Sequence, residues 1–230
     1  MTFILAVVRK DMSILAADRQ GNASGTGEFT IGQMKLKVTA PKITINGIKK
    51  ISLNRSKEFA VGIAGTYADH PYMSTVEACD DLRASFEAVT THASRYNFDA
   101  DKKPIMQGGA VMGNQSIASY FDDRYDSFFS TLFQFTPMMT SSATYYATRP
   151  GAGLLHVGSG SQVFESAVGV ESIEDFKRSI ADKADPTFAL NWLAEAFRLV
   201  SEKADGCGSD FVAVAATRDT RRFADLKVAP

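Results

Sequence analysis

The chain has 230 residues, of which 45% are hydrophobic, and its 25 basic and 26 acidic residues leave a formal net charge of −1. This length suits one globular domain with a substantial core. The charge forms no basic stripe, which argues against nucleic acid as a partner. No apolar run is long enough to predict a transmembrane helix, and the start of the chain lacks the pattern of a signal peptide. We therefore expect a cytoplasmic protein without membrane contact.

The first third of the chain is predicted to be mainly strands. Segments 3–8 and 13–17 are apolar and rich in β-forming residues, and the polar residues between them predict a hairpin. A strand that begins at residue 3 would hold the start of the chain inside the fold. Glycines scattered through 21–32 predict a loop. Further strands are expected at 35–38, 43–48 and 59–64.

Helical spacing follows Gly65. Apolar residues from Tyr72 to Val89 recur every three or four positions, which predicts one long amphipathic helix. The middle of the chain returns to strand patterns. These predicted strands cover 110–112, 117–121, 128–135, 144–148 and 154–157.

The last third is predicted to hold three helices and two strands. The first helix covers 162–168, Ser172 is expected to cap the second, and Asp185-Pro186 has residue types that favour the start of a third. Strands at 211–216 and 223–228 follow. The order of elements predicts a single α+β domain over 1–230, with two antiparallel sheets between helices.

Thr2 is the first candidate for chemistry. Its small side chain permits removal of Met1, after which one residue would carry both a hydroxyl nucleophile and an α-amine. An α-amine titrates at about pH 7.7 to 8, so it can accept the hydroxyl proton near neutral pH. On composition alone, Thr2 is simply the first residue of an edge strand.

The spacing of later motifs favours the chemical interpretation. Asp18 ends the second predicted strand, and Lys50 closes a Lys-Lys pair before an apolar residue. Ala64-Gly65 precedes the predicted long helix, and Gly158-Ser159-Gly160 precedes the next helix. Each motif is weak alone, but the ordered set resembles proteasome β subunits and, more closely, the bacterial HslV proteases, over most of the chain.

This resemblance implies a threonine endopeptidase with the four-layer αββα sandwich of N-terminal-nucleophile (Ntn) hydrolases. The catalytic roles it implies fall on Thr2, Asp18, Lys50 and Ser159, with the Gly65 N–H as the oxyanion donor. A Lys50 cation would favour the deprotonated Thr2 hydroxyl and amine, and Asp18 would keep that cation charged. The plainer interpretations are a strand-end ion pair, a turn glycine and a helix cap at Ser159.

The resemblance also implies substrate contacts at Gly21, Asn22 and Ile63. Family members carry an Asp and a Ser near the end of the last long helix, where this chain has Glu202 and Asp205. Which of these two joins the site stays open. Between Asp18 and Lys50 the chain is longer than is usual in the family, which predicts an inserted loop or hairpin within about 21–44.

Family members form stacked six- or seven-membered rings, so the resemblance implies a homo-oligomer, protein or peptide substrates and an ATP-dependent unfoldase partner. No metal or other cofactor is expected, because His70, His92 and His156 are widely separated and Cys79 and Cys207 fit neither a metal site nor a disulfide framework. Three alternatives stay open. They are a non-catalytic ring-forming subunit of the same fold, an Ntn amidohydrolase acting on a small amide, and a binding domain with chance similarity.

Overall fold

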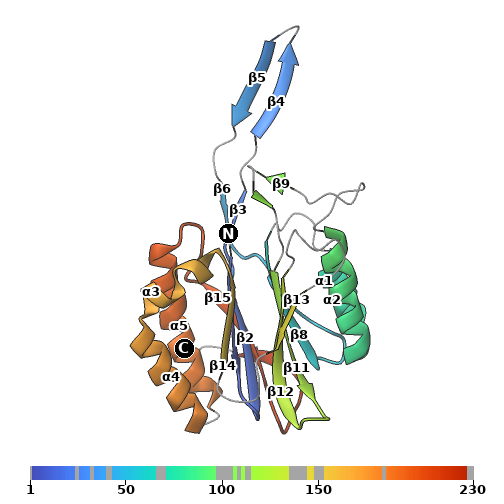
Figure 1. Cartoon of the computed structure of the whole chain (residues 1–230), viewed down its shortest axis with the longest axis vertical. Coiled ribbons are helices and arrows are strands. Elements are labelled where there is room, and N and C mark those ends of the chain that lie inside the picture. Colours follow the sequence, from blue (N-terminus) through green and yellow to red (C-terminus); the bar gives the residue numbers. More distant parts are fainter. Residues whose placement is uncertain are drawn as a thin grey trace.

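The computed structural model of the chain has a mixed α+β fold with antiparallel sheets (Figure 1). It describes residues 2–23, 26–31, 34–39, 43–65, 71–96, 106–107, 110–111, 115–134, 144–147, 153–182 and 185–226.

The first large sheet has five strands in the order β14-β1-β2-β15-β16. The predicted N-terminal hairpin is confirmed as β1 (Phe3–Val8) and β2 (Met12–Asp18), both buried along their whole length. β14 (Gly153–Gly158) pairs with β1 on one side of the hairpin. β15 (Phe211–Thr217) pairs with β2 on the other, and β16 (Ala224–Leu226) follows it. All pairs are antiparallel.

The second large sheet has the order β13-β12-β11-β8-β7. Its centre is β8 (Phe59–Ala64) paired with β11 (Gln115–Asp122), which forms a hairpin with β12 (Ser127–Gln134). β13 (Thr144–Ala147) and β7 (Ile51–Leu53) form the two edges. The strand at β7 is absent from the sequence prediction, because three residues are too few for an alternating pattern to be recognised.

Helices lie outside each large sheet (Figure 1). The first sheet is covered by α3 (Phe164–Val168), α4 (Val170–Asp182) and α5 (Pro186–Lys203). The second is covered by α1 (Pro71–Ala78) and α2 (Leu82–Tyr96). None of the helices in the described part of the chain is long and apolar enough to cross a membrane.

The alternation of side chains along β1 explains why this strand is apolar throughout. Phe3, Leu5 and Val7 pack against the helices of the first sheet. Ile4 and Val8 point the other way, into a cluster shared with residues of the second sheet. Because successive side chains of a strand face opposite sides, a strand covered on both faces needs a continuous apolar run.

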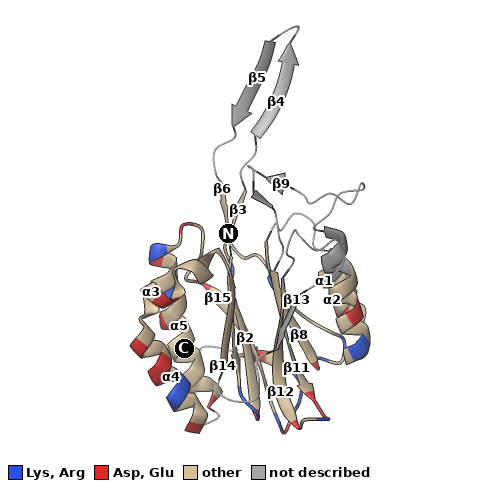
Figure 2. Cartoon of the chain, viewed as in Figure 1, with Lys and Arg blue, Asp and Glu red and all other residues tan. Residues whose placement is uncertain are grey.

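Charged side chains gather on the helices and at the ends of the strands (Figure 2). This is the ordinary distribution, since an ionised group is costly to bury without a partner. Asp18 and Lys50 depart from it: both are buried, with side chains 0% and 2% exposed.

The predicted loop at 21–32 is wrong, because strands form in this segment, while its interpretation as an insertion relative to the family stays a prediction. β4 (Thr26–Ile31) pairs with β5 (Met34–Thr39), and β3 (Gly21–Ala23) pairs with β6 (Ile43–Ile45) (Figure 1). The glycines of this segment predicted a loop although Phe29, Thr30 and Ile31 are β-forming residues. A further small pair joins β9 (Met106–Gln107) to β10 (Ala110–Val111).

The single long helix predicted after Gly65 is also wrong, because the chain forms two helices, α1 and α2. Asp81 lies between them, and its carboxylate accepts the Ala84 N–H at 2.8 Å. That contact is a helix cap, which satisfies a backbone donor that the first turn of a helix leaves unpaired. Asp81 therefore begins a second helix, which the apolar spacing alone does not show.

Of the two helix caps predicted in the last third of the chain, one is confirmed and one is wrong. Asp185 caps α5 as predicted and accepts the Thr187 N–H at 2.9 Å. Ser172 does not cap α4, which already begins at Val170 after Gly169. The predicted helix at 162–168 is two elements, a 3₁₀ turn η2 (Ser159–Gln162) and α3.

Candidate active site

The start of β1 brings Thr2 against the turn that follows β14. Thr2 is 5% exposed, and its backbone N–H donates to Ser159 Oγ at 3.0 Å. The Thr2 carbonyl accepts the Gly160 N–H and the Ser159 hydroxyl, each at 3.3 Å. The cap position of η2 is Gly158, so Ser159 is not its cap, and the Ser159 hydroxyl contacts Thr2 and Cys207. Thr2 and Ser159, which are far apart in the sequence, are therefore hydrogen-bonded at the start of β1.

Asp18, at the end of β2, is the centre of a second set of contacts. Its Oδ1 accepts the Phe3 N–H at 2.7 Å and the Lys50 ammonium at 2.8 Å. Its Oδ2 accepts the Gln20 N–H at 3.3 Å and the Gly208 N–H at 3.2 Å. One carboxylate oxygen therefore links Lys50 to the residue directly after Thr2. A carboxylate with four donors is well compensated for its burial.

Lys50 precedes β7 and points from the second sheet towards the first. Besides Asp18, its ammonium group donates to the Gln20 carbonyl. Burial lowers the pKa of Lys50 below the usual range for lysine, while the Asp18 carboxylate partly opposes this by favouring the charged form. A lysine whose pKa is lowered in this way releases and accepts a proton more readily at neutral pH than an exposed lysine does.

Glycine is required where β14 meets Thr2. Gly158 has φ of +91°, and a Cβ at this position would lie 2.1 Å from the Thr2 carbonyl oxygen. A Cβ at Gly160 would lie 2.7 Å from that of Phe3. Both distances are well inside van der Waals contact, so the Gly-Ser-Gly motif lets the turn approach the first residues of β1 closely enough for Ser159 to reach Thr2.

The end of β8 lies beside the same turn, at Gly158. A Cβ at Gly158 would lie 3.3 Å from the Ala64 side chain. Gln115, which is opposite Ala64 in the sheet, accepts the Gly158 N–H through its side-chain oxygen at 3.0 Å. Gly65 follows directly, is exposed and has φ of +145°, a conformation that few other residues adopt. The predicted oxyanion residue thus lies one residue from the Thr2 cluster.

The three predicted substrate residues occupy different settings. Ile63 is 2% exposed and packs with Met73 of α1, which leaves little of its side chain to line a pocket in this conformation. Gly21 is buried, and a Cβ there would collide with Ile48 at 2.2 Å. Asn22 accepts the Thr44 hydroxyl at 3.4 Å, and its buried Nδ2 has no partner among the described residues.

The loop after α5 contributes residues that the sequence analysis did not assign to the site. Glu202 is exposed and pairs with Arg198, and Asp205 is exposed as well. Cys207 and Gly208 instead face the cluster, through Ser159 and Asp18 respectively. In the sequence, the glycines on either side of Cys207, Gly206 and Gly208, are the feature that could have predicted a closely packed loop here.

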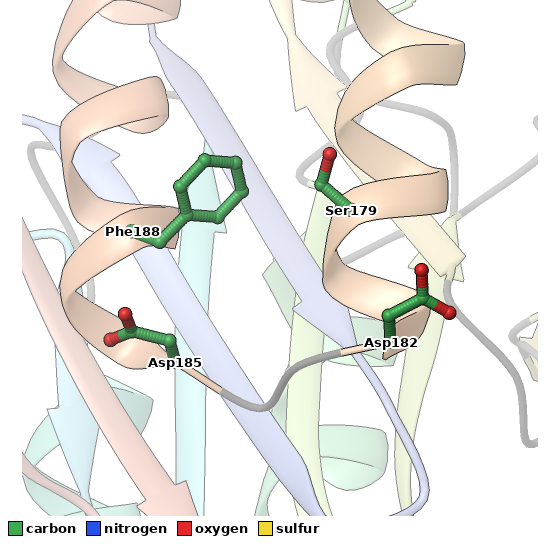
Figure 3. Close-up of a pocket in the computed structure, with 4 residues that line it drawn as sticks. All are labelled: Ser179, Asp182, Asp185 and Phe188. Atoms are coloured by element: carbon green, nitrogen blue, oxygen red, sulfur yellow. The ribbon is translucent and has the colours of Figure 1, made fainter.

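A separate pocket lies between the end of α4 and the start of α5 (Figure 3). Ser179, Asp182, Asp185 and Phe188 line it. Ser179 donates to the Asp175 carbonyl within α4, and Asp185 is occupied as the cap of α5. We assign this pocket no chemistry. Within the described ranges, no three His, Cys, Asp or Glu side chains are grouped as they would be around a metal ion.

No protein-family model matches the chain, and no curated protein sequence matches it either. The assignment of a function therefore depends on the geometry around Thr2 and on the motifs that carry the resemblance.

Proposed function

We propose that the protein is an N-terminal-nucleophile hydrolase. Within that class, its motifs favour a threonine endopeptidase of the proteasome and HslV type, with Thr2 exposed by loss of Met1. The observation that carries this proposal is the position of Asp18 Oδ1, which accepts both the Phe3 N–H and the Lys50 ammonium. A buried lysine is thereby tied to the backbone next to Thr2, while Ser159 contacts the Thr2 nitrogen.

The arrangement of the layers supports the same class. Helices α3 to α5, the first sheet, the second sheet, and helices α1 and α2 follow one another, with an apolar cluster between each pair. A four-layer αββα sandwich of the Ntn type would have this order. The strand that begins at Phe3 lies inside the first sheet, between β14 and β2, which holds the start of the chain within the fold.

The mechanism begins with attack of Thr2 Oγ on the carbonyl carbon of a peptide bond. The α-amine of Thr2 takes the hydroxyl proton, directly or through a water, and passes it to the leaving amine. The Gly65 N–H stabilises the oxyanion that forms, and the Lys50 charge favours the deprotonated nucleophile. A water activated by the same amine then hydrolyses the ester between Thr2 and the acyl group, which regenerates the enzyme.

The proposal extends to the setting of the site. Its substrates are proteins or peptides, and the chains form stacked homo-oligomeric rings in the cytoplasm with an ATP-dependent unfoldase as partner. Enclosure of the sites would protect other proteins from hydrolysis. These elements follow from the family resemblance, and native mass spectrometry of the purified chain tests the ring directly.

Hydrolysis of casein and of fluorogenic peptide amides by the purified full chain tests the activity. We expect cleavage by the parent, partial activity in Thr2→Ser, which keeps a hydroxyl and an amine on one residue, and none in Thr2→Ala. Cleavage by Thr2→Ala at the parent rate would contradict the proposal. An inactive parent that assembles into rings would favour the non-catalytic subunit instead.

A further inference from the structure

Cys207 lies in the loop after α5, next to Ser159, the residue that contacts Thr2. Its side chain is 4% exposed, and its Sγ is 3.7 Å from Ser159 Oγ. The Cys207 N–H donates to the Ala204 carbonyl at 3.1 Å, and the next residue, Gly208, donates to Asp18. The loop is therefore anchored on both sides of the cysteine, which holds the sulfur beside the serine.

The hydrogen bonds of Ser159 show why this neighbour matters. A serine hydroxyl has one hydrogen to donate and two lone pairs to accept with. The Thr2 N–H occupies one lone pair, and the Thr2 carbonyl at 3.3 Å accepts the hydrogen. Cys207 Sγ, at 3.7 Å, either shares that hydrogen as a second acceptor or donates its own S–H to the other lone pair. In either arrangement the hydroxyl hydrogen has an acceptor other than the Thr2 nitrogen.

Cys207 stays a neutral thiol in this setting. Burial raises its pKa, an effect that the Ser159 hydrogen bond and the nearby Lys50 ammonium of the second sheet partly oppose. The Asp18 carboxylate at the end of β2 acts in the same direction as burial. A neutral thiol forms only a weak hydrogen bond with a hydroxyl. When buried, even a weak hydrogen bond is sufficient to select one orientation of the freely rotating Ser159 hydroxyl.

We propose, on the basis of the proposed function, that Cys207 is a positioning residue that turns the Ser159 hydroxyl hydrogen away from the Thr2 amine. The amine acts as the base through its lone pair. A Ser159 hydroxyl that donated to this lone pair would compete with the Thr2 hydroxyl and weaken the base. With the hydrogen held by Cys207 and the Thr2 carbonyl, Ser159 accepts from the amine and leaves its lone pair to the nucleophile.

The pH dependence of kcat in single variants separates this role from simple packing. In Cys207→Ala the Ser159 hydroxyl can turn to the neutral amine and stabilise it. We expect kcat to fall about threefold, and the acidic limb of the pH–rate profile to move down by about 0.4 pH unit. Cys207→Ser keeps a donor and acceptor and should retain the parent limb. The other free cysteine, Cys79 in the segment after α1, provides the control Cys79→Ala, which should match the parent.

Each outcome has a distinct meaning when peptide hydrolysis is measured together with labelling by a peptidyl epoxyketone. A parent that neither hydrolyses peptides nor forms an adduct removes the proposed function, and this inference with it. An active parent whose Cys207→Ala variant keeps the parent limb and kcat overturns the inference alone. Equal decreases of kcat in both Cys207 variants, without a shift of the acidic limb of the pH–rate profile, would also overturn the inference. They would assign the thiol a purely structural role.

Discussion

Charged side chains at the two ends of β1 have opposite environments. At the start of the strand, Lys50 and Asp18 form an ion pair whose side chains are 2% and 0% exposed. Beyond its far end, Arg221 pairs with Asp123 across the turns of the two sheets, with exposures of 48% and 80%. The surface pair keeps most of its hydration, whereas the buried pair has lost it.

The difference indicates why each pair is present. A surface pair contributes little to stability and costs little to form. A buried pair has a desolvation cost that can exceed its electrostatic gain, and an apolar pair of similar volume is often at least as stable. Stability alone therefore accounts poorly for Asp18 and Lys50, whereas the proposed function, which needs a fixed charge near Thr2, would account for both.

Asp18→Asn is expected to have the largest effect. The amide has one acceptor oxygen in place of two, so it cannot satisfy all four donors, and Lys50 loses its counter-charge. We expect hydrolysis to fall at least about 100-fold and the free energy of unfolding by about 3 kcal/mol. Enzyme kinetics and urea denaturation measure both. The matched control is Asp123→Asn at the surface pair, which should leave both quantities unchanged; equal effects at the two positions would remove the contrast.

Gly158→Ala and Gly169→Ala form a second matched pair. Both glycines have positive φ, +91° and +88°, so an alanine is strained at either position by about 1–2 kcal/mol. At Gly169 a Cβ meets nothing within 4 Å, while at Gly158 it meets the Thr2 carbonyl. We expect Gly169→Ala to keep the parent rate of labelling by a peptidyl epoxyketone. The labelling rate of Gly158→Ala should fall more than about tenfold. Similar rates in the two variants would mean that contact between Gly158 and Thr2 is unimportant.

Ser159 and Ser161 allow a comparison within a single turn. Ser159 contacts the Thr2 nitrogen, whereas Ser161 is bonded to His156 Nδ1 at 2.5 Å. Ser159→Ala removes the acceptor for the amine and should lower kcat about tenfold, while Ser161→Ala should stay within about twofold of the parent. Peptide hydrolysis at saturating substrate tests the difference. A larger loss in Ser161→Ala would move the functional contact to the histidine.

His156 should give the smallest effect, on stability. Burial lowers its pKa below 6.5, with Glu165 opposing and Lys177 adding to the shift. The unfolded chain therefore takes up the proton first as pH falls, so this contribution to stability is present above about pH 6.5 and is lost below it. Between about pH 7 and 5, the free energy of unfolding of the parent should fall more steeply than that of His156→Asn, by less than about 1.4 kcal/mol per pH unit. Parallel slopes would contradict this.

Local patterns predicted the elements that depend on local physics. The apolar runs of β1 and β2 and the Asp185-Pro186 start of α5 were predicted from the sequence and are confirmed. Where two local signals compete, prediction failed. The glycines of 21–32 predicted a loop where β4 and β5 form a hairpin, and the apolar spacing of 72–89 predicted one helix although Asp81 caps a second.

The site required information that periodicity does not contain. Asp18 and Lys50 belong to different sheets, so only the family resemblance placed them together in advance. The contact of Cys207 with Ser159 depends on how the loop after α5 packs. A sequence pattern gives no measure of that packing. The resemblance pointed to Glu202 and Asp205 in the same segment, and both are exposed in the structure.

Intact-mass spectrometry of the purified chain, before and after incubation with a peptidyl epoxyketone, tests the central claim most directly. This reagent reacts with a hydroxyl and an amine on the same residue. The account predicts a mass lacking Met1, one added inhibitor per chain located on Thr2, and no adduct in Thr2→Ala. A chain that retains Met1 and forms no adduct, or one that forms the adduct equally in Thr2→Ala, would contradict it.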